Sequence, residues 1–418
     1  MVLLEIFILF TTTLGVVLAG RQFLLAWRVM SQPEACQPSD GRAEIDAVSD
    51  WPGVTILIPA HNEECVLAGC LSTMCALDYP EDKLSILVID DRSTDRTRAI
   101  AEEISNKNVG VRVLSRAPEA APGKAAAIAE GMAIAASDIL VLFDADYLPP
   151  PGLLKQLVAP FADPNVGATM GRVVPVNTDA GLLTKLLDLE RRAGYAVDQN
   201  GREMWGLNPQ FGGTVGGIRR AALESVGGWR VGHLAEDTDL TFRLVLAGWR
   251  VRYLNHAACY EEVPEDWPNR FRQVRRWAYG HNDCLLGYWS GVLRSPQLSF
   301  AQKIDGALLL LIYLFPVCAL VSTFAVIPLI AFAEHHLISW AWPWLAPILA
   351  AALLAPYTQV MVAAARDRQP HVLRALPLLF LSSCLSLVAA SAGVVLLARN
   401  LIAGVRPRWD KTRRYRTA

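Results

Sequence analysis

Two acidic side chains stand one residue apart directly after a short apolar run. Asp144 and Asp146 follow the run 139–143, whose sequence ILVLF is typical of a buried strand. Two carboxylates on alternate residues at a strand end can share a divalent cation and leave coordination sites open for diphosphate oxygens. A lone DxD sequence is common and is usually a solvated turn. Because this one ends a buried strand, we expect Asp144 and Asp146 to bind Mg²⁺ or Mn²⁺.

A second acidic pair, Asp90 and Asp91, ends the apolar run 84–89. A carboxylate there can accept a hydrogen bond from a base N–H or a ribose hydroxyl. The alternative is that both acids cap the helix that follows. Lys124 opens a helical pattern after a Pro-Gly pair, where it can either approach a phosphate or add charge to the surface.

A third acid, Asp237, lies between the glycine-rich stretch 211–217 and an amphipathic pattern over 240–247. An acid at a helix start is usually an N-cap. It can instead act as the general base for an acceptor hydroxyl, and spacing does not decide between the two.

The cluster QVRRW at 273–277 combines an aromatic ring with arginines. The ring can stack on a sugar, and an arginine can hold a diphosphate by paired hydrogen bonds. The alternative is a basic amphipathic helix that lies on anionic lipid.

Four apolar runs alternate with helical patterns and position these motifs. The apolar runs are 54–59, 84–89, 111–114 and 139–143. The first helical pattern follows the first run and ends near residue 77, and the other two cover 95–104 and 124–136. This alternation predicts a parallel sheet with crossover helices. Ligands of such sheets bind beyond the carboxyl ends of the strands, where the acid pairs lie.

Composition excludes some classes of function. The chain has 418 residues and a formal net charge of -1, so it offers no overall basic field for nucleic acid, and we expect no nucleic-acid partner. Its eight cysteines form no CxxC pair, and we expect neither a metal site nor disulfides from them.

Apolar residues concentrate near the two ends of the chain. Residues 3–19 are long enough to span a bilayer, and Arg21 and Arg28 follow them, which places this flank in the cytoplasm and Met1 outside. A cleaved signal peptide would carry its positive charge first, so we interpret the segment as an anchor.

Three later stretches, 306–333, 337–363 and 372–398, are also long enough to span. The basic loop 366–374 is expected in the cytoplasm, and Glu334, His335 and His336 on the other side. Four spans would then leave the arginine-rich tail, 406–416, outside, against the positive-inside rule. We therefore expect one apolar segment to be re-entrant or interfacial, or the count of spans to differ, and we suspect 372–398.

Together the motifs resemble an inverting family-2 glycosyltransferase with a GT-A fold, of the membrane-integrated β-glycan synthase type. That type includes cellulose, hyaluronan, chitin, mannan and poly-N-acetylglucosamine synthases. The motifs are IPAHNEE (58–64), VIDDRSTD (88–95), GK (123–124), FDADYLPP (143–150), GGTVGGIRR (212–220), AEDTDL (235–240) and QVRRW (273–277). The tail sequence RWDKT (408–412) also resembles the poly-N-acetylglucosamine subgroup. Ala235 departs from the pattern, since many members have Thr there.

The resemblance implies a role for each motif residue. It implies that the uridine part of the donor contacts Asp91, supported by Pro59, Asn62 and Glu63. Asp144 and Asp146 would hold the metal and the UDP diphosphate, with Lys124 at a phosphate, and Asp237 would be the catalytic base. Gln273, Arg276 and Trp277 match the QxxRW motif, which in the family contacts the diphosphate and lies by the acceptor sugar.

The predicted function is transfer of a sugar from a UDP-sugar to a growing β-linked glycan, with export through the membrane helices. Accessory export subunits are compatible with it. The first alternative is addition of a single sugar to a lipid-linked acceptor at the membrane. The second is a non-catalytic membrane scaffold, which is disfavoured because such a protein would be expected to lose some of the motif acids, and all are present.

These observations predict an α/β GT-A domain with a mostly parallel sheet and transmembrane helices on both sides. The expected parts are an anchor (1–30), a linker (31–50), the catalytic domain (51–285), an interfacial segment (286–304), transmembrane helices (305–400) and a basic tail (401–418). The expected location is the plasma (inner) membrane, as a multi-pass protein with a cytoplasmic catalytic domain.

Overall fold

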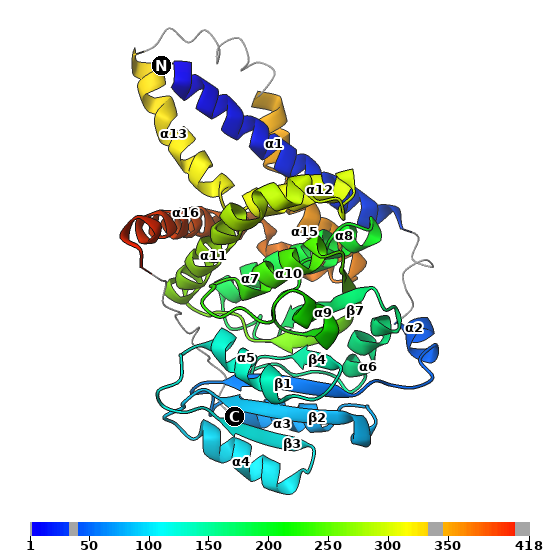
Figure 1. The fold of residues 1–418 in the computed structure, drawn as a ribbon. Helices are drawn as coiled ribbons and strands as arrows, with labels where there is room; N and C mark the ends of the chain where they lie inside the picture. Colours follow the sequence, from blue (N-terminus) through cyan, green and yellow to red (C-terminus); the bar gives the residue numbers. More distant parts are fainter. Residues whose placement is uncertain (1, 33–40, 333–345, 406–418) are drawn as a thin grey trace.

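The computed structural model describes residues 2–32, 41–332 and 346–405 (Figure 1). Glu334, His335, His336 and the tail motif at 408–412 lie outside these residues, as do parts of the expected linker and of the expected span 337–363.

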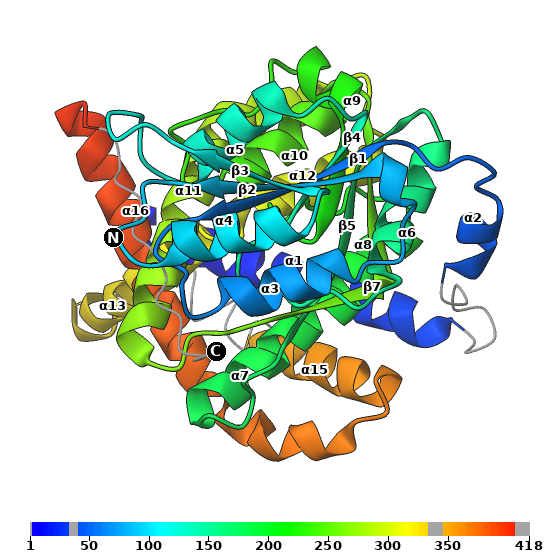
Figure 2. The same ribbon diagram turned by 90° about the horizontal axis from the view of Figure 1, so that it is seen from below.

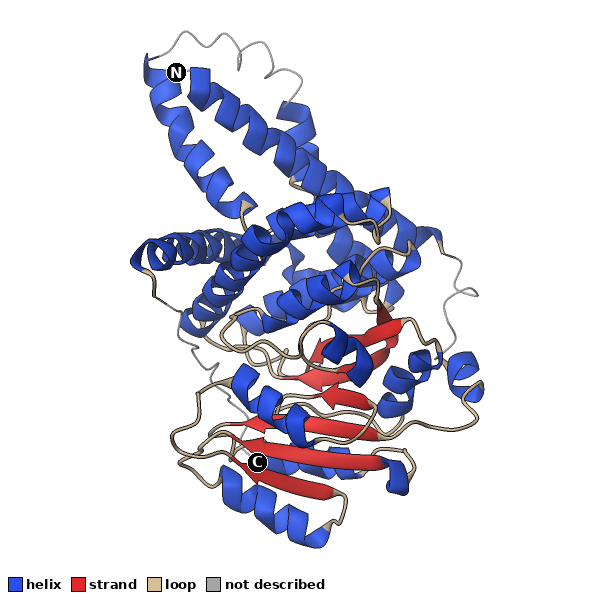
Figure 3. Cartoon of the chain, viewed as in Figure 1, coloured by secondary structure: helices blue, strands red, loops and turns tan. Residues whose placement is uncertain are grey.

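One seven-stranded sheet forms the base of the molecule (Figure 3). Its strand order is β3-β2-β1-β4-β6-β5-β7, and only β6 runs antiparallel to its neighbours. The strands are β1 (Val54–Ala60), β2 (Leu84–Asp90), β3 (Val111–Ser115), β4 (Ile139–Leu142), β5 (Val166–Pro175), β6 (Gly216–Arg219) and β7 (Arg250–Glu261). The predicted mostly parallel sheet is confirmed, and the four predicted runs match β1 to β4 within a residue at each end.

Both faces of the sheet are covered at β1, β2 and β4, which explains why these strands are predominantly apolar. In β1, Ile56 and Ile58 pack with residues of α3, whereas Leu57 points to the opposite face and packs with Ala127 and Ile128 of α5. Because side chains alternate between two covered faces, Thr55, the one polar residue of β1, is also buried, and its hydroxyl hydrogen-bonds with that of Ser137 at 2.8 Å.

Helices cover the two faces in separate groups (Figure 2). One face carries α3 (Leu67–Cys75), α4 (Thr97–Lys107) and α6 (Leu153–Val158), and the other carries α5 (Lys124–Ile134), α9 (Arg220–Ser225) and α10 (Glu236–Leu246). A long connection from β5 to β6 forms α7 (Leu182–Arg192), the π-helix η4 (Ala193–Gln199) and α8 (Asn200–Met204). The remaining short elements are α2 (Arg42–Asp46), η2 (Glu81–Lys83) and η3 (Ala159–Ala162).

The apolar helices lie together beyond one edge of this domain (Figure 1). They are α1 (Val2–Ser31), α12 (Phe300–Leu311), α13 (Phe315–Phe332), α15 (Ala355–Arg366), the 3-10 helix η5 (Pro370–Leu378) and α16 (Leu379–Ala403). Within the described residues, three helical stretches are long and apolar enough to cross a membrane: Val2–Ser31, Ala346–Arg366 and Pro370–Ala403. A fourth is reached if α12 and the following helix count as one bent span.

That bent pair breaks the expected span 306–333, because α12 and α13 meet at an angle of 60°. Pro316 in the first turn of α13 has no N–H to donate back toward the end of α12, which helps to end the first helix there. The suspected segment 372–398 instead lies in a stretch that meets the length and composition required of a span. The segment 306–333 therefore contains a break, and the re-entrant or interfacial character suspected of 372–398 stays a prediction.

Helix α11 (Trp267–Arg294) joins the sheet domain to the apolar helices and carries the QVRRW cluster. It runs through the expected domain boundary at residue 285. Glycines allow its close packing: a Cβ on Gly280 would lie 2.5 Å from the backbone nitrogen of Ala235, and one on Gly393 of α16 would lie 2.5 Å from the carbonyl oxygen of Arg275. The cluster is thus fixed between the loop before α10 and an apolar helix.

Candidate active site

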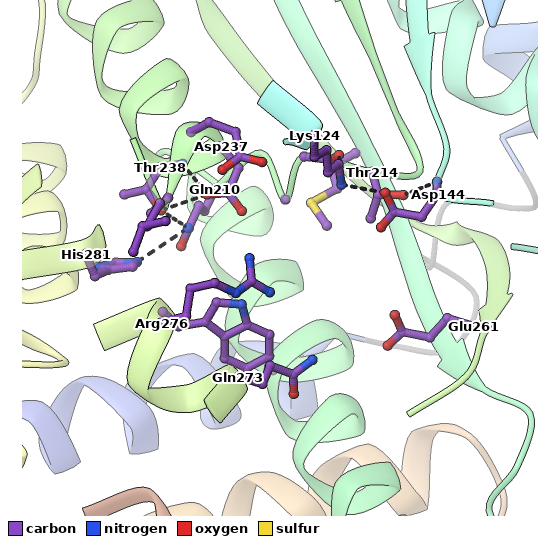
Figure 4. A pocket seen from close by; sticks show the side chains of 18 of the residues that line it. Lys124, Asp144, Gln210, Thr214, Asp237, Thr238, Glu261, Gln273, Arg276 and His281 are labelled. Atoms are coloured by element: carbon purple, nitrogen blue, oxygen red, sulfur yellow. Dashed lines mark hydrogen bonds and ion pairs between the residues drawn. The ribbon is translucent and has the colours of Figure 1, made fainter. Parts of the chain in front are cut away.

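A cavity of about 430 Å³ lies between the carboxyl ends of the strands, α11 and α12 (Figure 4). Most of the residues that sequence reasoning singled out line this cavity: Pro59, Glu63, Asp91, Lys124, Asp144, Gln273, Arg276, Trp277 and Asp237. Asn62 and Asp146 are not among its lining residues. The chain therefore gathers motifs from six separate segments at one site.

Lys124 and Asp144 form an ion pair on one side of the cavity. The ammonium nitrogen of Lys124 lies 2.5 Å from a carboxylate oxygen of Asp144 and donates to the carbonyl oxygen of Gly213 at 3.2 Å. Burial alone lowers the pKa of Lys124, but Asp144 and Glu236 outweigh it and raise that pKa above its usual value. Lys124 is therefore cationic at the cavity wall and suited to an anionic ligand.

Asp144 and Asp146 differ in their access to the cavity. Asp144 is partly exposed, and its backbone N–H donates to Thr214 Oγ1 at 3.3 Å. Asp146 is fully buried, and one of its carboxylate oxygens accepts the backbone N–H of Glu262 at 3.4 Å. The oxygen donor set fits a hard divalent cation, with Asp144 at the cavity and Asp146 enclosed behind it. Within the described residues, no group of three or more His, Cys, Asp and Glu side chains is placed to hold a metal without further ligands.

Asp91 is already bound by neighbouring groups. One oxygen accepts from Arg92 at 2.9 Å and from Arg116 at 2.6 Å, and the other accepts the backbone N–H of Gly123 at 2.9 Å. Burial alone raises the pKa of Asp91, but these hydrogen bonds and charges hold it below its usual value. Asp91 thus fixes the loop that leads into Lys124, in addition to any contact with a nucleotide.

Asn62, which was expected to support nucleotide binding, joins two loops. Its side-chain oxygen accepts the backbone N–H of Thr94 at 2.8 Å, and its own N–H donates to Ser93 Oγ at 3.0 Å. Asn62 also has a positive φ of 55°, a conformation that asparagine tolerates better than most residues. Asn62 is exposed and is not among the residues that line the cavity, while His61 beside it is.

Asp237 stands in the first turn of α10 and is held in place by its own helix. Its Oδ1 accepts the backbone N–H of Thr238 at 2.6 Å and the Thr238 hydroxyl at 3.3 Å. Burial raises the pKa of Asp237, opposed by the Thr238 N–H and by Lys124. Burial and the adjacent Asp237 carboxylate likewise raise the pKa of Glu236. A carboxylate with a raised pKa is a stronger base, as proton abstraction requires.

Asp239 holds neighbouring elements together. It is fully buried, pairs with Arg243 at 2.7 Å and with Arg230 at 3.3 Å, and accepts from the hydroxyl of Tyr288. These partners tie α10 to the preceding loop and to α11, away from the cavity.

The side chains of the QxxRW motif lie across the cavity from Lys124 and Asp144 (Figure 4). Within the described part of the chain, Arg276 has no hydrogen-bond or ion-pair partner, so its guanidinium is available to an anion. Trp277 lies between Arg191 and Arg270, whose guanidinium carbons are 5.7 and 5.1 Å from the ring centre. Arg191 in turn pairs with Glu261 at 2.7 Å.

Sequence reasoning missed a row of polar residues beside Asp237. The amide nitrogen of Gln210 donates to Thr238 Oγ1 at 2.7 Å and lies 3.4 Å from His281 Nε2. Both Gln210 and His281 line the cavity. Neither residue forms a motif with other polar residues at a fixed spacing in the sequence, so no spacing signal could have identified them.

Comparisons with known proteins agree with this geometry. The family model described as "Glycosyltransferase like family 2" matches residues 52–280. The chain is 36% identical over 243 residues to the probable glycosyltransferase YdaM of Bacillus subtilis (strain 168), covering 58% of each protein. It is 33% identical over 305 residues to a beta-monoglucosyldiacylglycerol synthase of Synechocystis sp., covering 72% of this chain and 63% of that relative. The chain thus spans about three-fifths of the length of these curated relatives.

Among solved structures, the fold is similar to that of the mannosyltransferase PcManGT from Pyrobaculum calidifontis, in complex with GDP-Man and Mn²⁺. The TM-score is 0.56 at 21% identity, and the match covers 85% of this chain and 98% of that one. At this identity the likeness supports the GT-A-like fold alone.

Proposed function

This chain belongs to the glycosyltransferase like family 2 and is an enzyme, and we propose that it transfers one sugar from a nucleotide-sugar to a lipid acceptor at the membrane surface. The observation that carries the proposal is the composition of the cavity wall. Leu309, Ile312 and Tyr313, at the end of α12 and the bend that follows it, form an apolar part of this wall. An apolar wall continuous with a candidate membrane helix suits a lipid. One relative is also named for the synthesis of a glycolipid.

The donor half of the reaction needs cations around a diphosphate. Lys124 and Arg276 supply positive charge from opposite walls of the cavity, where they would stabilise the charge that develops on the leaving nucleotide. Asp144, with Asp146 behind it, would hold Mg²⁺ or Mn²⁺, which would neutralise further diphosphate charge when bound. The donor base would lie toward Pro59, His61 and Asp91.

The acceptor half needs a base. The acceptor oxygen attacks the anomeric carbon of the donor as the bond from that carbon to the diphosphate oxygen breaks, and the configuration inverts. The hydroxyl proton passes to the Oδ2 of Asp237, because Oδ1 is already bound to Thr238. The pair of bonding electrons leaves with the nucleotide diphosphate.

Polymer synthesis, the function first predicted from the motifs, is the second candidate. Trp277 of the QxxRW motif lines the cavity, where its ring could support the end of a glycan chain. One relative is named for a glycolipid, and another, 29% identical over 290 residues, is named a glucomannan 4-beta-mannosyltransferase, so the relatives are compatible with both candidates.

One experiment separates these functions. Membranes or detergent-purified protein are incubated with radiolabelled nucleotide-sugars, and the products are divided by organic extraction and gel electrophoresis. We expect label in a lipid carrying one sugar. A ladder of long labelled glycan without labelled lipid would replace the first candidate by the second.

We also propose that the chain is an integral membrane protein with its catalytic domain in the cytoplasm. The three spanning-length helices and the arginines Arg21 and Arg28 at the domain end of α1 support this proposal. We expect the protein to resist carbonate extraction from membranes. Release into the soluble fraction by carbonate would contradict it.

A further inference from the structure

The two halves of helix α1 differ in their surroundings. In the first half, Leu3 and Phe10 are 83% and 57% exposed, as suits a helix that faces lipid. In the second half, Leu25 and Ala26 are each 1% exposed, and Ala26 packs with apolar residues of η4. A Cβ on Gly201 of α8 would lie 3.1 Å from the Cβ of Leu25, so these two helices are in close contact. The second half of α1 is therefore packed as part of the catalytic domain.

Arg21 begins this buried half and forms ion pairs with two carboxylates. Its Nη1 donates to Asp198 of η4 at 2.6 Å, and its Nε donates to Asp305 of α12 at 2.6 Å. Arg21 is not among the residues that line the cavity, whereas Asp198 is. Burial alone raises the pKa of Asp198, but Arg202 and Arg21 outweigh it and hold that pKa well below its usual value. An ionised carboxylate between two arginines thus fastens η4 to α1.

The π-helix η4 continues this connection into the cavity wall. Gln199 follows Asp198 in η4, and its side chain is bonded twice to the backbone of Gln210. It donates to the carbonyl oxygen of Gln210 at 2.7 Å and accepts the N–H of Gln210 at 3.0 Å. Gln199 is buried, so both bonds are shielded from water. The position of Gln210 therefore depends on that of η4.

Gln210 carries the connection to the proposed base. Its amide nitrogen donates to Thr238 Oγ1 at 2.7 Å, and this hydroxyl lies 3.3 Å from Asp237 Oδ1 (Figure 4). A hydroxyl that accepts from an amide has its own proton free for another acceptor, so it donates to Asp237. Burial raises the pKa of Asp237, and the bonds from Thr238 lower it. Gln210 thus helps to keep Asp237 ionised and fixed in rotation.

We propose that Arg21 is a positioning residue of the reaction, so that α1 belongs to the catalytic apparatus in addition to anchoring the chain. Arg21 fixes η4, and η4 fixes Asp237 through the hydrogen bonds described above. The inference rests on the assignment of Asp237 as the base in the proposed function. It makes sugar transfer depend on the docking of the N-terminal helix. A chain in which α1 is displaced would lose turnover before it loses affinity for the nucleotide-sugar.

The test measures initial rates of the full-length protein in isolated membranes, which supply the acceptor, with the nucleotide-sugar that the unsubstituted protein uses. Arg21→Met should lower turnover at saturating nucleotide-sugar by about tenfold, the effect of one lost hydrogen bond to a charged group. The KM for the nucleotide-sugar should stay unchanged. Arg21→Lys, which keeps a cation for Asp198, should recover part of the rate.

The pH profile gives a readout that a purely structural role would not change. The acid limb of turnover should move to higher pH in Arg21→Met, because a weaker bond from Thr238 raises the pKa of Asp237. The other titratable groups that interact with Asp237 are the same in this variant: Glu236 beside it, Lys124 of α5, Tyr195 of η4, Arg276 and Cys284 of α11, and Tyr313.

Arg28→Met is the matched control, since it removes an equal charge from the same end of α1. The hydrogen bond of Arg28 goes to the carbonyl oxygen of Met204 in α8, at 3.3 Å. This variant should keep the turnover and the pH profile of the unsubstituted protein. Both variants should be present in the membrane fraction in equal amounts.

A double variant tests the route from α1 to the base. Gln210→Met removes the donor to Thr238 and should reproduce both the loss of turnover and the shift of the acid limb. If both residues act through one connection, the variant that combines Arg21→Met with Gln210→Met should be little worse than either single variant. Losses that multiply, or an acid limb that stays in place in both single variants, would overturn the inference. If Arg21→Met does not fold, Arg21→Lys takes its place in the same comparison.

The outcomes separate this inference from the function on which it rests. Normal turnover in Arg21→Met beside an inactive Asp237→Asn overturns the inference and leaves the proposed function standing. Normal turnover in Asp237→Asn removes the base on which both depend.

Discussion

Replacement of Asp237 by asparagine is the most informative perturbation of this site, because it removes a base and little else. Asparagine keeps an oxygen that can accept the N–H of Thr238, the 2.6 Å bond that now positions the side chain. The shape of the first turn of α10 is therefore retained. Lys124 loses a nearby negative charge but keeps its ion pair with Asp144.

The expected loss follows from the task assigned to Asp237. General-base catalysis contributes on the order of 10²–10⁴ in rate, so turnover should fall by at least about a hundredfold, equivalent to about 2.7 kcal/mol of activation free energy. A group that acts in the transition state contributes little to ground-state binding, so affinity for the nucleotide-sugar should change little.

The assay measures nucleotide release at saturating donor and acceptor, with donor affinity determined separately by titration. Glu236→Gln is the matched control, since it neutralises the adjacent carboxylate of the same cavity wall and should retain more activity than Asp237→Asn. Near-normal turnover in Asp237→Asn together with an inactive Glu236→Gln would mean that the base is the neighbouring acid. The family assignment would survive that result.

Four further predictions concern charge. Asp237 must be ionised to act, and burial raises its pKa, so kcat/KM should fall on the acid side at a pH above the ordinary aspartate range. Lys124→Met should move this acid limb of the pH profile to higher pH, because the lysine charge lowers the pKa of Asp237. An acid limb that does not move would count against the interaction between Lys124 and Asp237. EDTA should abolish activity and Mn²⁺ or Mg²⁺ restore it, while Asp144→Asn should raise the metal concentration needed; full turnover in EDTA would remove the metal assignment. Asp91→Asn should weaken nucleotide binding more than turnover and also lower the melting temperature, because the buried Arg116 loses a charged partner. Asp239→Asn should cost about 3 kcal/mol of stability, measured by denaturant unfolding, since it breaks a buried ion pair; unchanged stability would contradict its structural role.

The strands that carry the donor motifs could be predicted from sequence because both of their faces are buried. β4 is an uninterrupted apolar run and β1 is interrupted only by Thr55, and polar residues begin within two positions of the end of each strand. The antiparallel β6 could not be identified in the same way. It is four residues long and half glycine, so it carries almost no periodic signal.

Other parts of the site depend on tertiary contacts that leave no local pattern. Asn62 belongs to a recognisable motif, yet its side chain is used to hold Thr94, which only the folded arrangement of two loops reveals. His281 and Gln210 are 71 residues apart and meet because α11 packs on the loop before α10. The expected boundary at residue 285 falls inside α11, because the helical pattern of that helix continues through it.

The stereochemistry of the product tests the central account most directly. The purified protein is given an α-linked nucleotide-sugar and a lipid acceptor, and the anomeric proton of the isolated glycolipid is examined by NMR. A direct displacement assisted by Asp237 predicts a β-linked product that carries a single sugar. An α-linked product would contradict the single displacement and the role of Asp237 with it.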